Sequence, residues 1–128
     1  MVRKVKTARQ RQITRLDKLC SEFIRKRAMQ RVGGCERGLT PKKDYSQLQC
    51  SHFWGRARKS VRYDEDNAIG LCGACHLYLT SHPAEHVEFF KKLLKEKFDL
   101  LEGRMRNTEK PDLNLIELYL KSKLEEMG

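Results

Sequence analysis

The sequence has no long apolar run, only 3 prolines and only 8% aromatic residues. Its apolar stretches are a few residues long, whereas a membrane-spanning helix needs about 20 apolar residues. The basic N-terminus also lacks the apolar segment of a secretory signal. At 128 residues the chain has room for one domain. These features predict a single-domain protein that is intracellular and cytoplasmic, without membrane contact.

Acidic residues are scarce in the first part of the chain. Residues 1–31 hold eleven Lys and Arg but only Asp17 and Glu22 as acidic residues, so nine of the ten net positive charges lie there. Such a block indicates a nucleic-acid contact or a disordered basic arm, and the alternative is a solvated helix face. A second basic group lies inside the motif described below and comprises Arg56, Arg58, Lys59 and Arg62.

The chain has five cysteines, and an odd number argues against a disulfide framework in an intracellular protein. Cys72 and Cys75 form a CxxC pair, a spacing that lets two thiolates reach one tetrahedral ion. Cys20 falls on the apolar side of an expected helix, where packing is its expected role. The cysteine pattern therefore predicts metal binding.

The spacing of apolar residues predicts an α+β fold. An apolar stripe predicts a helix over residues 8–31, ended by Gly33 and Gly34. Alternation over residues 48–54 predicts a strand, and residues 68–72 predict a second one. Further helices are expected over 75–80, from Pro83 onward and over 112–127. The helix that is expected from Pro83 onward has an apolar stripe of Val87, Phe90, Leu94, Phe98 and Leu101.

The most informative stretch covers residues 50–82. His52 is followed fifteen residues later by Asn67 and nine residues after that by His76, which directly follows Cys75. This pattern resembles the HNH nuclease superfamily, whose fold is a two-stranded hairpin and a helix around a metal. The string SHFWGRARKSVRYDEDN followed by LCGACH is most similar to the phage NinG-type recombination endonucleases and their prophage relatives. The resemblance is specific over about residues 48–82 and much looser over the flanking helices.

The resemblance implies a zinc-stapled ββα-metal core with flanking helices. The basic N-terminal helix would cover residues 1–33, the zinc knuckle and ββα core residues 34–82, and the C-terminal helices residues 83–128 of one nuclease domain. The implied function is divalent-metal-dependent cleavage of DNA, in phage or prophage DNA processing or recombination.

The resemblance also implies roles for individual residues. His52 would be the general base, Asn67 would orient His52 or brace the connecting loop, and His76 would bind the catalytic Mg²⁺ or Mn²⁺. The basic group would hold the DNA backbone. Residues outside the family pattern are expected to be structural, with His82 starting a helix, His86 at the surface and Trp54 in the core.

Three positions depart from the family pattern, and one of them is Leu79, which stands where the common CHxxKT ending has its lysine. Ser51 stands where many relatives have an acidic or histidine metal ligand, and serine is a poor ligand for a hard cation. The first CxxC pair of NinG-type relatives reads Cys35-Glu36-Arg37-Gly38 here. The expected structural zinc ligands are therefore Cys35, Cys72 and Cys75, with Cys50 as the nearest thiol that could complete a tetrahedron. The alternative is that Cys50 packs in the core.

Two other functions remain open from the sequence. A non-catalytic, zinc-containing DNA-binding module would keep the fold without cutting, and Ser51 favours this alternative. A protein-binding adaptor would explain the charge but not the spacing of His52, Asn67 and His76.

Overall fold

The first helix is long and is capped at both ends. The computed structural model describes residues 4–128, and helix α1 covers Ala8–Val32. The Thr7 hydroxyl accepts a hydrogen bond from the Gln10 backbone N–H, and the Gln10 side chain bonds back to Thr7, which forms a capping box. Gly33 ends the helix in the left-handed conformation, with φ of 67°. The predicted first helix is confirmed.

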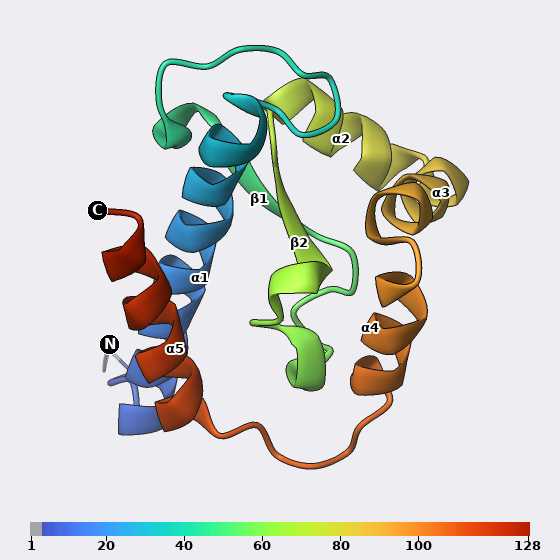
Figure 1. Cartoon of the computed structure of the whole chain (residues 1–128). Helices are drawn as coiled ribbons and strands as arrows, with labels where there is room; N and C mark the ends of the chain where they lie inside the picture. The colour runs from blue at the N-terminus through green and yellow to red at the C-terminus, as the bar shows by residue number, and fades with distance from the viewer. Residues whose placement is uncertain (1–3) are drawn as a thin grey trace.

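A two-stranded antiparallel hairpin lies at the centre of the molecule (Figure 1). Strand β1 covers Gln49–His52 and pairs with strand β2, which covers Ala68–Leu71. Both predicted strands are confirmed, although β1 is shorter than expected. The connection between them contains two 3-10 turns, at Lys59–Val61 and Glu65–Asn67.

Helix α1 lies very close to one face of this hairpin. A Cβ atom added at Gly70 would stand 2.6 Å from the Cβ of Ala28, which is closer than two non-bonded carbon atoms can approach. Both positions therefore need small residues. Because side chains alternate along a strand, Gly70 and its partner Cys50 face α1, whereas Ser51 and Ile69 face the other side.

Three helices follow the hairpin. Helix α2 covers Gly73–Ser81, α3 covers Pro83–Leu94 and α4 covers Lys97–Met105. The apolar stripe from Val87 to Leu101 predicted one continuous helix, and this is wrong, because the chain breaks at Lys95, whose φ is 54°. Val87 itself is 36% exposed.

Aromatic packing explains the break between α3 and α4. The ring centroids of Phe90 and Phe98 lie 5.0 and 5.3 Å from that of Phe53. In one straight helix these two residues would be separated by about 12 Å along the axis, at 1.5 Å per residue. The break at Lys95 turns the chain so that both rings contact Phe53. The buried core on this side of the hairpin includes Ile69, Leu71 and Leu79.

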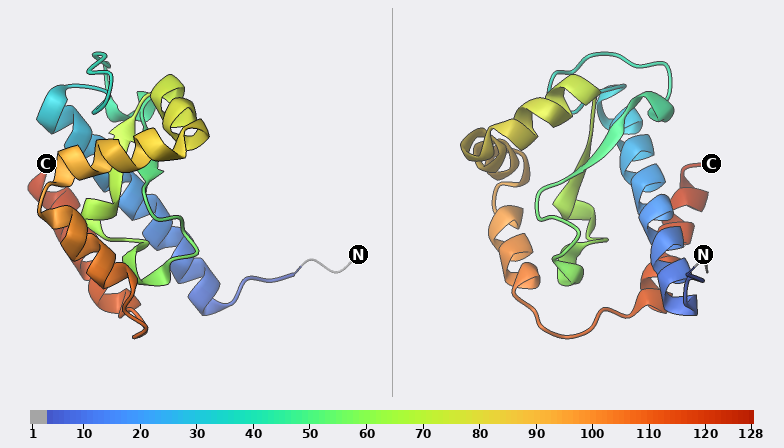
Figure 2. Two further views of the ribbon diagram at one scale, coloured as in Figure 1. Left: turned by 90° about the vertical axis from the view of Figure 1, so that its right-hand side faces the viewer. Right: turned by 180° about the vertical axis from the view of Figure 1, so that it is seen from behind.

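The last helix, α5, covers Leu113–Glu126 and packs against α1. Asp112 caps its first turn by accepting a hydrogen bond from the Leu115 N–H. Figures 1 and 2 place α1 and α5 on one side of the hairpin and α3 and α4 on the other, joined by the extended segment before α5. The fold is therefore α+β, as predicted. In the described part of the chain, no helix combines the length and the apolar character that crossing a membrane requires.

Candidate functional site

Three cysteine thiols meet at one end of the hairpin. Cys35 lies in the loop after α1, Cys72 follows β2, and Cys75 lies in the first turn of α2. Their three Sγ atoms all lie within 4.8 Å of one another. This thiol cluster could hold a metal ion, and among residues 4–128 it is the one group of three or more potential ligands of this kind. Three of the four predicted zinc ligands are thus brought together.

Glu36, which no local sequence pattern marks, positions Cys35. The Glu36 N–H donates to the Gly70 carbonyl at 2.9 Å, and the Glu36 carboxylate accepts from the Gly70 N–H at 2.7 Å. The side chain is buried, and Arg31 lies 3.3 Å from its carboxylate. Through these contacts Glu36 binds the loop to the free edge of β2, which places Cys35 beside the cysteines that follow that strand.

Hydrogen bonds to sulfur favour the deprotonated form of Cys35 in the thiol cluster. The Gly38 N–H donates to the Cys35 Sγ at 3.4 Å, and the Arg37 Nη1 donates to the Cys75 Sγ at 3.5 Å. Burial raises the pKa of Cys35, but backbone N–H groups, including those of Cys72 and Gly38, more than offset this and lower it overall. Burial raises the pKa of Cys75 despite the contact with Arg37.

Cys50 does not join the thiol cluster, so the prediction that it supplies the fourth zinc ligand is wrong. It faces α1 and packs against the buried group that contains Leu16, Cys20 and Phe23. Burial raises the pKa of Cys50 to about 11, which disfavours a thiolate. The physical reason is its place on the strand, because Cys50 points to the helix-covered face while the thiol cluster lies beyond the strand end. Cys20 is buried, as expected.

His52 ends β1 at the opposite end of the hairpin from the thiol cluster. Its Nε2 lies 3.0 Å from the backbone carbonyl oxygen of Arg62. A carbonyl only accepts, so Nε2 carries the proton and Nδ1 keeps its lone pair. Burial lowers the pKa of His52, so the imidazole is neutral near pH 7. The geometry leaves His52 with a ring nitrogen that can accept a proton.

Asn67 is fully buried and braces the loop that follows His52. Its Oδ1 accepts from the Trp54 N–H at 2.8 Å, and its Nδ2 donates to the carbonyls of Trp54 and Val61 at 2.9 and 3.0 Å. One side chain therefore joins two points of the loop. The second of the two roles expected for Asn67, bracing the loop, agrees with these contacts.

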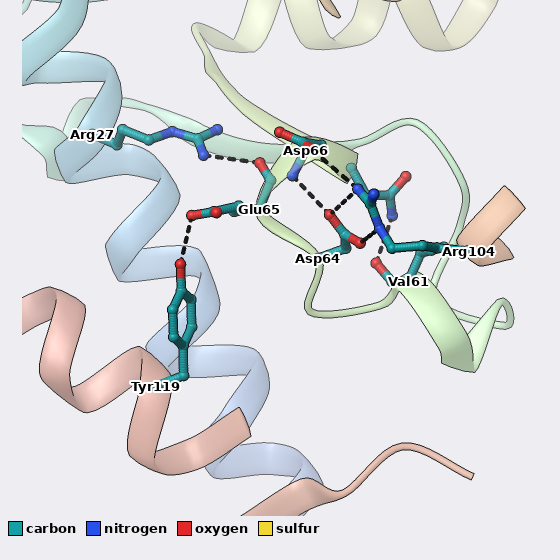
Figure 3. Close-up of polar contacts among 8 residues, drawn as sticks. Arg27, Val61, Asp64, Glu65, Asp66, Arg104 and Tyr119 are labelled. Carbon is teal, nitrogen blue, oxygen red and sulfur yellow. Dashed lines mark hydrogen bonds and ion pairs between the residues drawn. The ribbon is translucent and has the colours of Figure 1, made fainter. Parts of the chain in front are cut away.

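The acidic residues before Asn67 are held by three helices (Figure 3). Arg104 of α4 contacts Asp64 at 2.6 Å and Asp66 at 3.0 Å. Arg27 of α1 donates to the Glu65 carbonyl at 2.8 Å, and Tyr119 of α5 donates to the Glu65 carboxylate at 3.0 Å. We call Asp64, Glu65 and Asp66, together with these contacts, the acidic clamp. It fixes the backbone that carries Asn67. No local sequence pattern marks Arg27, Arg104 or Tyr119 as functional residues, because their partners lie far away along the chain.

His76 lies on α2 and contacts the residue next to His52. Its Nδ1 is 3.0 Å from the Ser51 hydroxyl oxygen. His76 belongs to no group of three or more candidate ligands within the described residues. Mg²⁺ prefers six oxygen ligands, so one imidazole and one hydroxyl do not form a cage for it.

Three of the four residues of the basic group are exposed. These are Arg56, Arg58 and Lys59, and the Arg58 guanidinium lies 5.6 Å from the ring centre of Trp54. Arg9 of α1 and Lys110 line the same surface hollow as Arg58 and Lys59. Part of the N-terminal basic block thus joins the loop after β1. Its first residues, 1–3, lie outside the described part of the chain.

Arg62 differs from the other members of the basic group. Its Nε and Nη2 donate to the two carboxylate oxygens of Asp17 at 2.9 and 2.7 Å, which ties the loop to α1. A guanidinium paired in this way is not free to bind phosphate, so the predicted DNA contact of Arg62 is not supported. Its carbonyl contacts His52, so the ion pair with Asp17 also helps to position the imidazole.

Comparison of the chain with family models, curated proteins and solved structures found no match.

The two remaining histidines differ in their surroundings. His82 lies at the start of α3, as predicted, without a side-chain capping hydrogen bond, and its ring stacks on that of Tyr78 with 4.0 Å between the ring centroids. His86, expected at the surface, is half-buried, and its ring packs 5.2 Å from those of Phe53 and Phe90. The His86 Nε2 is buried without a hydrogen-bond partner in the described residues, and burial lowers the pKa of His86. Trp54, expected in the core, is half-buried.

Proposed function

We propose that this chain is an HNH-type endonuclease that hydrolyses phosphodiester bonds of DNA, in phage or prophage DNA processing or recombination. The observation that carries the proposal is the contact of the His52 Nε2 with the Arg62 carbonyl. It leaves Nδ1 as a proton acceptor on a neutral imidazole, which is the form that a general base needs. The spacing of His52, Asn67 and His76 supports the same proposal.

In the proposed reaction, His52 takes a proton from the attacking water. The water oxygen forms a bond to phosphorus, the ester bond to the leaving oxygen breaks, and that oxygen is protonated by solvent. Asn67 keeps the loop after His52 in place through its three hydrogen bonds. Arg56, Arg58 and Lys59 bind backbone phosphates, which position the DNA without reading its sequence.

The described residues offer few ligands for the expected Mg²⁺ or Mn²⁺. His76 offers one ligand, and its neighbour Ser51 is a weak one. Binding of a divalent ion would then depend on water and DNA phosphate for the other ligands, so affinity without DNA should be weak. Metal dependence is therefore a property to be measured together with cleavage.

We further propose that the thiol cluster of Cys35, Cys72 and Cys75 binds a structural zinc ion. Thiolate sulfur is a preferred zinc donor, and the three Sγ atoms already lie within 4.8 Å of one another. An ion at this point would join the loop after α1 to the end of β2 and the start of α2. Its role would be to stabilise the hairpin.

A zinc-containing DNA-binding module that does not cut is the alternative. It is favoured by the position of Ser51, whose hydroxyl contacts His76 where a further metal ligand would be expected. Such a module would retain the exposed basic group and the thiol cluster. It would bind DNA and leave it intact.

Cleavage of supercoiled plasmid distinguishes the enzyme from the binding module. Purified protein is incubated with Mg²⁺ or Mn²⁺, and in parallel with EDTA. His52→Ala should reduce the cleavage rate by about two orders of magnitude, which is the usual contribution of a general base. His82→Ala is the matched control and should cut at the wild-type rate, because His82 lies at a helix start away from His52. A His52→Ala protein as fast as wild type would refute the mechanism.

The N-terminal basic block gives a second test that applies to both functions. If it contacts phosphates, DNA affinity should fall steeply as salt rises. Removal of residues 1–6 deletes Arg3, Lys4 and Lys6 but leaves α1 and its Thr7 cap intact. The log–log salt slope should then become shallower, by roughly 0.9 for each lost phosphate contact. An unchanged slope would mean that these residues do not contact DNA.

A further inference from the structure

The thiol cluster has three sulfur atoms, and the surroundings of Gly38 mark where a fourth ligand would stand. A Cβ atom built at Gly38 would lie 3.3 Å from the Cys75 Sγ and 4.0 Å from the Cys35 Sγ. The Gly38 N–H already donates to the Cys35 Sγ. A side chain at position 38 would therefore point at the cluster, but glycine has none.

This side of the thiol cluster faces solvent. Gly38 and its neighbours Leu39 and Thr40 are exposed, whereas Cys35 on the inner side is fully buried. Water and small solutes can therefore reach the position that a residue at 38 would occupy. On the inner side, Cys35 belongs to the buried core that includes Leu48 and Leu71.

No other side chain of the described residues supplies a good fourth donor at this point. The cluster contains no further Cys, His, Asp or Glu, and Cys50 packs against α1. Arg37 contacts the Cys75 Sγ, but its guanidinium stays protonated and cannot ligate a metal. Thr40 places a hydroxyl 3.4 Å from the Cβ position of Gly38, and a neutral hydroxyl is not among the usual zinc ligands.

Arg37 alters the charge of the cluster. Zinc with three thiolates carries one net negative charge, and a fourth thiolate would add another. Arg37 places a positive charge 3.5 Å from the Cys75 Sγ, and its guanidinium is held 4.4 Å from the ring centre of Tyr78. Tyr78 is fixed in turn by a hydrogen bond from its hydroxyl to Glu85. This fixed cation favours an anionic fourth ligand.

We infer that the thiol cluster is an open zinc site, in which the chain supplies three ligands and a small exogenous thiolate takes the fourth position beside Gly38. The inference rests on the zinc assignment proposed above and is independent of the nuclease mechanism. Zinc prefers four ligands, so the free position is filled by whatever good donor solvent offers. The protein then retains its zinc better when small thiols are present, whereas a site with four cysteines retains zinc without them.

Cobalt spectroscopy tests the inference on the full chain. Co²⁺ replaces zinc in protein kept reduced with a phosphine, and 2-mercaptoethanol is then added as the probe thiolate. In the wild type, the sulfur-to-cobalt charge-transfer band should grow and the visible bands should shift as the thiol binds. Gly38→Cys should give the stronger band without added thiol and should not respond to it. Gly38→Ala adds the same Cβ without sulfur, so it should not give the stronger band before thiol is added.

The zinc affinity gives a second measurement. Gly38 does not have a positive φ, so a cysteine fits its backbone. Gly38→Cys should hold zinc at least tenfold more tightly than the wild type in competition with a chelator when no thiol is present. A wild-type cobalt spectrum that ignores 2-mercaptoethanol would overturn the inference, even if the variants do not fold. A wild-type protein that binds neither metal would overturn it together with the zinc assignment, while plasmid cleavage would still decide the nuclease proposal.

Discussion

Substitution of Asn67 measures how much its bracing of the loop contributes to the stability of the protein. Asn67→Ala removes the three hydrogen bonds that join Trp54 and Val61 to this side chain. Each buried hydrogen bond contributes about 1 kcal/mol net, so the free energy of unfolding should fall by about 3 kcal/mol. For a chain of this length, that loss corresponds to a decrease in Tm of about 10 °C. Urea denaturation followed by circular dichroism measures both the loss and its cooperativity.

Asn67→Asp separates hydrogen bonding from shape. The aspartate has almost the same size, but it replaces a donor to two carbonyls by an acceptor, and it places a carboxylate at a fully buried position. It should therefore destabilise the protein at least as much as Asn67→Ala at pH 7. Asn107→Ala, at an exposed asparagine, is the control and should change stability by less than about 0.5 kcal/mol.

Measuring the zinc content of the Asn67 variants shows whether their effect is confined to one end of the hairpin. The thiol cluster follows the Gln49–Leu71 pair, whereas Asn67 precedes the His52–Ala68 pair. Both Asn67 variants should thus retain the zinc content of the wild type under conditions where they remain folded, while plasmid cleavage falls. If Asn67→Ala and Asn67→Asp both unfold within about 0.5 kcal/mol of the wild type, the brace does not contribute as reasoned.

Three further predictions follow from individual contacts. Cys50→Ser should retain zinc and Cys72→Ser should lose it, as measured by metal analysis after dialysis; equal losses would return Cys50 to the ligand set. Gly70→Ala should lower the free energy of unfolding by about 1–3 kcal/mol, because its methyl group would overpack against Ala28. In the double variant, Ala28→Gly should recover part of this loss. If urea denaturation shows that the losses of the two single variants simply add, the close approach of the two positions is contradicted. Burial lowers the pKa of His86, so the unfolded chain binds its proton more readily, and stability should fall as pH drops below about 6.5. His86→Phe should reduce this dependence and leave stability at pH 7 equal or higher; an unchanged pH profile would exclude His86 as its source.

The sequence predicted the elements whose signals are local. The stripe of apolar residues, together with Gly33, predicted α1 to within one residue at its end. The alternating pattern predicted both strands, and the CxxC pair predicted two of the candidate metal ligands that follow β2. These signals depend on neighbours within a few residues, which is why they can be read from the chain alone.

Features that depend on long-range packing were not predictable in this way. Neither glycine nor proline marks the break at Lys95, because its cause is the shared contact of Phe90 and Phe98 with Phe53. Cys50 and His52 lie on one face of β1, as the alternation of a strand requires, but that alternation does not reveal that α1 covers this face. Glu36 was missed because its partner, the edge of β2, lies 34 residues away.

The acidic clamp bears on whether the motif of this protein can be transplanted. Residues 34–82 contain His52, Asn67, His76 and the thiol cluster, so they look like a self-sufficient cassette. The backbone around Asn67, however, is anchored by Arg27, Arg104 and Tyr119, and all three lie outside that range. A graft of residues 34–82 onto another scaffold would carry the ligands but leave behind the anchors. Protein engineers should therefore move the helices with the motif, or rebuild their three contacts in the host.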